Sequence, residues 1–327
     1  MKLGLFLLLI LGVSASLGSL IPQGQSGAFY KMYYGRLLGS LIVFLSLDNL
    51  FRSWWFIALG IILAASILSC SVQRIRKLPG RKGWGSILLH LSILVVLAGA
   101  VVSGVFGRSA YVEVGVGDSI DLTGKGFPGQ VLTLKDFNIA YYPNLEPKQY
   151  YSKVALKTND GREIEREISV NHPLKFKGLK IYQTSYGWMT RGRVIADGEA
   201  IPFDLESGGE LAIDQNSNLR LKLIFVPDFD EKTGTLRSKS PLPRNPRLAC
   251  ALIQGHNLIE GKILREGETG EIKGYRITFS GYRYYTGLTV KKDPGVTIVY
   301  LGFALILLGL AVRYLAPDKK RLRDEVN

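Results

Sequence analysis

The sequence predicts a membrane protein in which four transmembrane α-helices carry a large extracytoplasmic domain of antiparallel β-strands, folded as a sandwich or an open barrel. One observation is that uncharged apolar windows of about 20 residues, the length that crosses a bilayer, occur four times in the chain of 327 residues. The other is that apolar and polar residues alternate in short runs between the third and fourth windows, as they do in half-buried strands. The predicted spans are residues 3–22, 54–72, 85–107 and 295–312.

The distribution of Lys and Arg predicts the orientation of these spans. Short loops rich in basic residues remain in the cytoplasm, and residues 73–83 contain five basic residues and no acidic one. By alternation, both termini are cytoplasmic and the β domain is extracytoplasmic. Residues 1–107 then hold three spans, 108–293 the β domain, 294–315 the fourth span and 316–327 a basic cytoplasmic tail. We expect the first span to be retained, because its apolar run is long for a signal peptide.

Two shorter stretches refine this plan. The apolar run at 37–47 is too short to cross the membrane, so we expect a helix that lies on the outer surface or dips into it. The fourth span opens with Asp293, Pro294 and Gly295. An acid beside the positive end of a helix and a proline in its first turn are both favourable, which predicts a defined helix start.

Composition excludes several classes of function. The β domain holds 27 basic and 23 acidic residues, so only +4 of the net charge of +14 belongs to it. The remaining excess flanks the membrane spans, where it attracts anionic lipid, and nucleic-acid binding is disfavoured. The two cysteines, Cys70 and Cys250, form no CxxC motif, which disfavours thiol–disulfide chemistry and covalent haem attachment. No phosphate loop, HExxH or GxSxG motif is present, and no catalytic constellation is predicted.

His90 is the one residue in the spans that suggests chemistry. It lies about 8 Å, at 1.5 Å per residue, from the cytoplasmic end of the third span. Polar groups at such a depth face a partner, a cavity or a cofactor. Two interpretations stay open at this point: a neutral imidazole hydrogen-bonded across helices or to Ser86 one turn back, and an axial ligand of haem iron. His172 and His256 are predicted to be surface residues.

The third span also has small residues at Gly99, Ser103 and Gly107, four apart, a spacing that allows a second helix to approach closely. His90 points roughly 180° away from Gly99 around the helix. One face is therefore predicted to pack on another helix and another face to present the imidazole.

Several stretches resemble the ResB family, also called CcsB, of the system II pathway of cytochrome c biogenesis. They are "ASLGSLIPQ", "SWWF", "SCSVQRI", the histidine-bearing third span, "VNHPLKFKGLKIYQTSYG" and "DPGVTIVYLGFALILLGL". Their order and spacing match over nearly the whole chain. Asn171, Pro173, Gly178, Tyr182 and Gln183 match the motif of the outer domain, and we interpret them as turn and packing residues rather than as contacts to apocytochrome c.

The resemblance implies a protein of the bacterial plasma membrane that works with a CcsA (ResC) partner. Such a pair takes haem from the cytoplasmic side and presents it outside for attachment to apocytochrome c. His90 matches the family's axial ligand of a membrane-embedded haem b, which is bound non-covalently and shared with the partner. The tryptophan-rich motif of the partner is absent here, so the chain is expected to be a non-catalytic subunit of a holocytochrome c synthase complex. The alternative is a membrane-anchored β-domain scaffold or chaperone that binds no cofactor.

Overall fold

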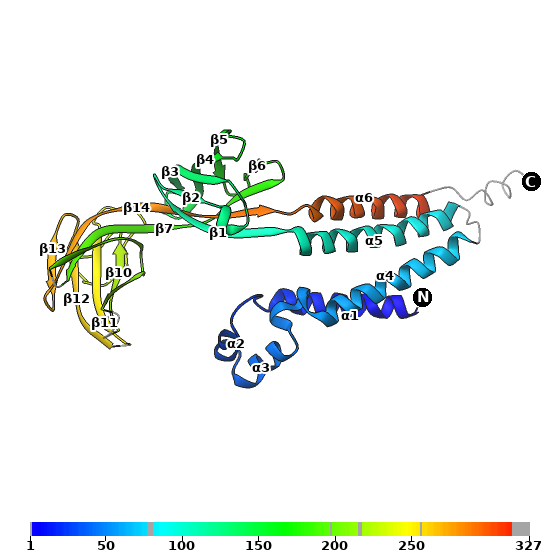
Figure 1. Cartoon of the computed structure of the whole chain (residues 1–327), viewed down its shortest axis with the longest axis horizontal. Helices are drawn as coiled ribbons and strands as arrows, with labels where there is room; N and C mark the ends of the chain where they lie inside the picture. Colours follow the sequence, from blue (N-terminus) through cyan, green and yellow to red (C-terminus); the bar gives the residue numbers. More distant parts are fainter. Residues whose placement is uncertain (1, 77–80, 197, 215–217, 256, 316–327) are drawn as a thin grey trace, which may run out of the picture. The chain divides into compact units, whose positions relative to one another are not determined.

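The computed structural model describes residues 2–76, 81–196, 198–214, 218–255 and 257–315. His256 and the predicted basic tail at 316–327 lie outside these ranges. The chain divides into two compact units (Figure 1). One unit, Arg108–Lys292, is made of strands, and the other is made of the helices that precede and follow it.

Four helices are long and apolar enough to cross a membrane, which confirms the prediction of four apolar helices with a β-rich segment between the third and the fourth. They are α1 (Lys2–Leu20), α4 (Trp54–Ile75), α5 (Arg81–Phe106) and α6 (Gly295–Tyr314). The helical unit also contains α2 (Gly27–Tyr33), α3 (Arg36–Phe44) and the 3₁₀ helix η1 (Leu47–Arg52). Helix α3 overlaps the apolar run at 37–47, and its position on the membrane surface stays a prediction. Helix α2 was not predicted.

A hydrogen-bonded corner closes the connection between α1 and α4. The Gln23 amide donates to the carbonyl oxygens of Gly18, Ile21 and Leu47 at 2.9–3.0 Å, and it accepts from the Leu50 N–H at 3.0 Å. Leu50 is fully buried and packs where a Cβ atom at Gly18 would stand. A backbone that leaves a helix needs such partners for its unpaired groups, so this corner gives Gln23 a structural role.

Helices α5 and α6 are antiparallel and pack through a seam of small residues (Figure 1). In α6 the seam residues Gly295, Gly302 and Gly309 are seven apart and buried. A Cβ atom added at Gly302 would lie 2.5 Å from Val96 Cγ2, and one added at Gly99 would lie 2.8 Å from Val299 Cγ2. The backbones can therefore approach this closely only because these positions lack side chains.

Not all of the small residues that were predicted to face another helix, four apart in the sequence, lie in the seam. Gly99 and Ser103 do face α6, but Gly107 lies over the Ser103 carbonyl of its own chain segment. A period of seven keeps one stripe in contact along two helices, whereas residues four apart drift around the helix axis. At the start of α6, Asp293 Oδ1 accepts hydrogen bonds from Ser103 Oγ at 2.6 Å and from Gly295 N at 3.1 Å.

The β unit consists of three antiparallel sheets, which confirms the predicted antiparallel strands. None of the three closes on itself, so a barrel is not confirmed. In the first sheet the strands lie in the order β1-β14-β7-β6, and in addition β13 pairs with β14 and β8 pairs with β7. The second sheet has the order β12-β11-β10-β9, and the third has the order β2-β3-β4-β5. The strands are β1 (Arg108–Gly115), β2 (Ser119–Asp121), β3 (Val131–Tyr141), β4 (Pro147–Lys157), β5 (Glu163–Ser169), β6 (Leu174–Phe176), β7 (Leu179–Ala196), β8 (Glu199–Glu206), β9 (Glu210–Asp214), β10 (Leu219–Val226), β11 (Arg247–Gln254), β12 (Asn257–Arg265), β13 (Thr269–Ile272) and β14 (Tyr275–Lys292).

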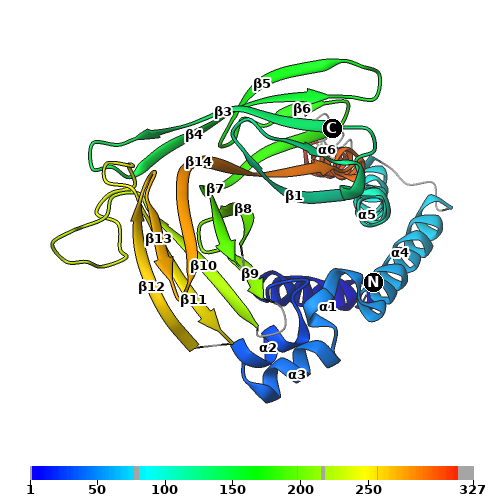
Figure 2. The same cartoon turned by 60° about the vertical axis from the view of Figure 1, so that its left-hand side comes forward.

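Strands β7 and β14 pair along their whole length and contribute to two separate cores (Figures 1 and 2). One core, which includes Ile181 and Leu288, packs against the sheet of β2–β5, and the other, which includes Val194 and Phe279, packs against the sheet of β9–β12. Aromatic rings fill the middle of the ribbon, with the Trp188 and Tyr284 centroids 3.9 Å apart. The two strands are thus the common scaffold of the β unit.

The seam gives a first prediction. Gly99→Val should lower the free energy of unfolding in detergent by about 1–3 kcal/mol, the usual cost of overpacking, because its side chain would meet Val299. Gly104→Val in the same helix is the matched control, since a Cβ atom there has no neighbour within 4 Å. Thermal unfolding of both variants measures the difference, and equal losses would contradict the seam.

Candidate functional site

The imidazole of His90 lies on the side of α5 that faces α4. His90 is half-buried, and its Nδ1 lies 3.3 Å from Ser71 Oγ of α4. It points roughly 140° around the helix from the middle of the glycine seam, at 100° per residue. Of the two hydrogen-bond partners that the sequence left open, the structure shows one across helices, on α4, and not Ser86. Ser86 Oγ accepts a hydrogen bond from Arg74 of α4.

The hydrogen bonds of Ser71 assign the tautomer of His90. Ser71 is buried, and its hydroxyl donates to the Ile67 carbonyl oxygen at 2.8 Å. A hydroxyl carries a single proton, so toward His90 this oxygen acts as the acceptor and Nδ1 acts as the donor. A neutral imidazole protonated at Nδ1 has its lone pair on Nε2. No described residue hydrogen-bonds Nε2.

A second polar contact and an apolar cluster fix the same pair of helices. The contact between Arg74 and Ser86 lies one turn from the contact between Ser71 and His90, toward the end of the span that carries the basic loop. In the opposite direction, Leu63 and Ile67 of α4 pack with Ile93 of α5 and Leu7 of α1. These contacts hold α5 against α4 on both sides of His90 along the helix, so rotation of α5 cannot carry the imidazole away from α4.

These features fit the axial ligand of a haem. Such a ligand needs a partner for its other ring N–H, and Ser71 lies where it can supply that partner. Within the described ranges no group of three or more His, Cys, Asp or Glu side chains could hold a metal ion.

Comparison with known proteins establishes the family. The model of the ResB-like family matches residues 1–81 and 80–321 of this chain. The chain belongs to the ResB-like family. Its relatives include the cytochrome c biogenesis protein CcsB of Gloeobacter violaceus, 26% identical over 98% of this chain and 82% of the relative. The CcsB protein of Microcystis aeruginosa is 25% identical over 98% of this chain and 86% of the relative.

Among solved structures, the cytochrome c haem lyase CcmF aligns with 95% of this ResB-like chain at 16% identity and a TM-score of 0.33. The alignment spans only 39% of CcmF.

The segment 170–187, which carries the outer-domain motif, forms turns and strand. Asn171 has a left-handed φ of 67° in the turn between Ser169 and His172, whose backbone groups exchange hydrogen bonds of 2.9 and 3.2 Å. Lys177 and Gly178, with φ of 44° and 81°, make the two-residue turn between β6 and β7. Positive φ at both central positions is typical of a type I′ hairpin, which Gly favours. His172 is exposed in its turn.

The later part of this segment is tied into the core. Gln183 Oε1 accepts from Ser152 Oγ at 2.5 Å and from Thr286 Oγ1 at 2.9 Å, and both of these hydroxyl residues are fully buried. The Gln183 amide nitrogen donates to the Ser185 carbonyl oxygen at 2.8 Å. Buried polar groups that are satisfied in this way specify a single packing. Tyr182 pairs with Thr289 across β14.

Cys250 is a core residue, whereas Cys70 on α4 is half-buried. Burial raises the pKa of the Cys250 thiol to about 12. Because the thiolate is the reactive form, Cys250 is unsuited to thiol–disulfide chemistry in the folded protein.

The reactivity of the Cys250 thiol tests whether the core that contains Val194 and Phe279 excludes solvent. In a Cys70→Ser variant, alkylation of Cys250 at pH 8 should be about a thousandfold slower in the native protein than after denaturation, since each pKa unit changes the thiolate fraction tenfold. Mass spectrometry of iodoacetamide adducts over time gives both rates. Similar rates in the two states would show that Cys250 is accessible and the core is not closed.

Proposed function

We propose that this chain is a cytochrome c maturation factor that binds haem b non-covalently through His90 and delivers it across the membrane to apocytochrome c, together with a CcsA/ResC-like partner. The relatives named cytochrome c biogenesis protein CcsB support the pathway. One observation from the structure carries the haem assignment: His90 Nδ1 lies 3.3 Å from Ser71 Oγ, and the Ser71 hydroxyl donates to the Ile67 carbonyl oxygen. From this contact we infer the Nδ1–H tautomer, which would leave Nε2 for the iron.

The residues of this chain have distinct roles in the proposal. His90 Nε2 would bind the haem iron, and Ser71 would keep that nitrogen deprotonated and the ring in a fixed orientation. The porphyrin nitrogens would supply the iron's other ligands from the haem itself. Since a haem in a membrane protein of this kind has a second axial ligand, and this chain offers one histidine in its spans, the opposite ligand comes from the partner. The glycine seam keeps α6 on the far side of α5, so that the imidazole faces away from it.

In this proposal both termini and the loop at 73–83 are cytoplasmic, and the β unit is extracytoplasmic. The basic residues of the loop support this orientation. His90 then lies near the cytoplasmic end of its span and receives haem from that side. The β unit lies on the side where apocytochrome c is matured, and it receives or orients that protein.

The ligand assignment makes a spectroscopic prediction. In the complex purified with its partner, His90→Gly should reduce the Soret absorbance per complex several-fold, and added imidazole should restore it by filling the vacated space. Leu91→Gly is the matched control: it introduces the same helix cost of about 1 kcal/mol at the adjacent, largely exposed position. An unchanged Soret band in His90→Gly would contradict the assignment, as would a loss that Leu91→Gly reproduces. A wild-type complex that lacks haem altogether would support the alternative function, a membrane-anchored scaffold or chaperone that binds no cofactor.

The role of Ser71 is tested separately. Ser71→Ala removes the acceptor of the Nδ1–H group, and loss of such a partner costs about 10–100-fold in metal affinity. We expect a decrease of this size in the haem affinity of the complex, measured as the rate and extent of transfer to apomyoglobin. Ser92→Ala is the control, because Ser92 is buried in α5 and donates to the Leu89 carbonyl oxygen of its own helix. Equal transfer from the two variants would show that Ser71 does not act on haem.

A further inference from the structure

One edge of the β unit contains both of its connections to the membrane spans. The pairing of β1, β14, β7 and β6 places Arg108, Lys292, Leu179 and Phe176 in a single row across the sheet. Arg108 follows the end of α5 after one residue, and Lys292 precedes α6 by three. With 3.8 Å between consecutive Cα atoms, Lys292 lies within about 11 Å of the first residue of α6. The chain connections therefore keep this end of β1 and β14 within a few residues of the ends of α5 and α6.

The next row is dominated by lysine. Ser109, Lys291, Lys180 and Lys175 pair across the same four strands. Directly paired residues share a face of the sheet, and the row that follows, with Leu174, Ile181 and Val290, is buried in the core. The lysines therefore project from the opposite face. Like charges side by side destabilise a sheet, and a negatively charged surface facing this row would reduce their repulsion. Of the eight residues in the two outermost rows, five are basic and none is acidic.

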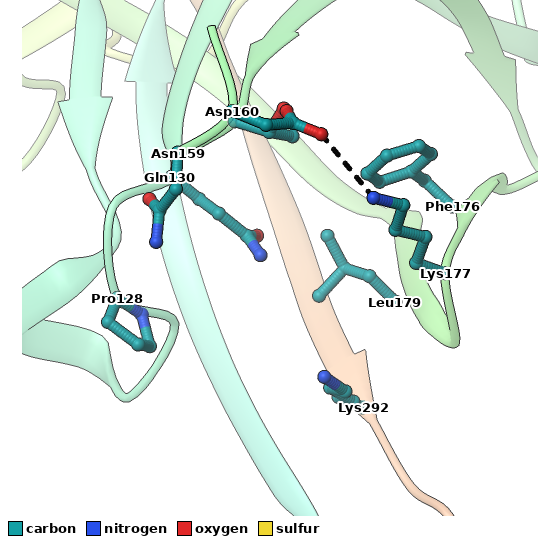
Figure 3. A pocket seen from close by; sticks show the side chains of 9 residues that line it. Pro128, Gln130, Asn159, Asp160, Phe176, Lys177, Leu179 and Lys292 are labelled. Carbon is teal, nitrogen blue, oxygen red and sulfur yellow. Dashed lines mark hydrogen bonds and ion pairs between the residues drawn. The ribbon is translucent and has the colours of Figure 1, made fainter. Parts of the chain in front are cut away.

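A pocket of about 250 Å³ opens at the same edge (Figure 3). Lys177 and Lys292 approach it from two sides, with Leu179 between them (Figure 3). The type I′ turn described above presents Lys177, whose Nζ lies 3.4 Å from Asp160 Oδ2. The remaining lining residues are Pro128, Gln130, Thr158, Asn159, Asp160 and Phe176.

The loop on one side of this pocket is held in place and contributes an unsatisfied group. Arg108 Nη1 donates to the Gly126 carbonyl oxygen at 2.8 Å, which fixes the loop that leads to Gln130. Gln130 Oε1 is buried and has no hydrogen-bond partner. Buried polar atoms are nearly always paired, and because this amide oxygen is an acceptor, a hydrogen-bond donor from outside the chain, such as a headgroup hydroxyl or water, would complete this pocket.

We propose that this edge of the β unit binds phospholipid headgroups of the bilayer that α5 and α6 cross, with a lipid phosphate between Lys177 and Lys292 and anionic lipids facing the lysine row. The short connections keep this edge close to the ends of the spans, and the positive charge of the lysines attracts anionic lipids. Bound lipid would fix the orientation of the β unit relative to the membrane. The inference rests on the membrane spans of the proposed function, but not on haem binding or on which side the β unit occupies.

Native mass spectrometry of the full chain, released from nanodiscs that contain phosphatidylglycerol and phosphatidylcholine, tests this proposal. The wild type should retain phosphatidylglycerol preferentially. Lys177→Ala/Lys292→Ala and Lys175→Ala/Lys180→Ala/Lys291→Ala should each reduce its retention at least about tenfold, as expected when several contacts of this kind are lost. The matched control is Lys232→Ala/Lys239→Ala/Lys262→Ala, which removes exposed lysines of the same unit away from this edge.

Three results would overturn the proposal. The edge variants could retain as much phosphatidylglycerol as the wild type, or the control could lose as much as they do. Soluble glycerol phosphate could also bind as tightly as the lipid, which would make this a site for a soluble anion. The wild type alone supplies an independent measurement, because retention should fall when the ionic strength of the exchange buffer is raised to about 1 M, where the Debye length is about 3 Å. The Soret band of the same variants purified in complex with the partner tests haem binding separately, so a failure of the lipid proposal can be distinguished from a failure of the proposed function.

Discussion

A polar ring inside an apolar helix pair must be hydrogen-bonded, and the contact between His90 and Ser71 meets this requirement. It also decides which helix the imidazole faces. The glycine seam brings α5 against α6 too closely for a side chain to intervene, so a ring on the other side of α5 turns toward α4. There Ser71 supplies a single acceptor, because its own proton is used by the Ile67 carbonyl oxygen. The free Nε2 is the chemical consequence of that arrangement.

The β unit is built on a different constraint. Its first and last strands pair with each other from Arg108 and Lys292 onward, directly beyond the two helices of the seam in the sequence. The long strands β7 and β14 then extend past the first core and form a second one, with a stack of aromatic rings between the two. The motif segment at 170–187 supports this construction through its tight turns and the buried Gln183. Of its three lysines, Lys177 pairs with Asp160 at 3.4 Å, and Lys175 and Lys180 face each other across β6 and β7.

Much of the helical unit was predictable from the sequence, because the spans are set by hydropathy. Their predicted ends were less exact: α4 continues to Ile75 and α6 to Tyr314, since a helix can extend past the first charged residue, whereas an uncharged window stops there. His90 was identified as the candidate ligand, but its partner was not, because Ser71 lies on another helix and only the packing of α4 on α5 brings the two together. Ser71 could have been noticed as a hydroxyl near the end of an apolar span. The three open sheets were not predictable, because alternation identifies strands but does not show that two of them run through both cores.

The identity of the haem ligand can be measured directly. The chain has three histidines, so His172→Gln and His256→Gln leave His90 as the only one. If this variant is labelled with ¹⁵N-histidine and assembled with an unlabelled partner and haem, electron–nuclear double resonance of the ferric complex should show the strong ¹⁵N coupling of a nitrogen bound to iron. A spectrum of a haem-loaded complex without that coupling would contradict the account, because the imidazole would then serve only to join two helices.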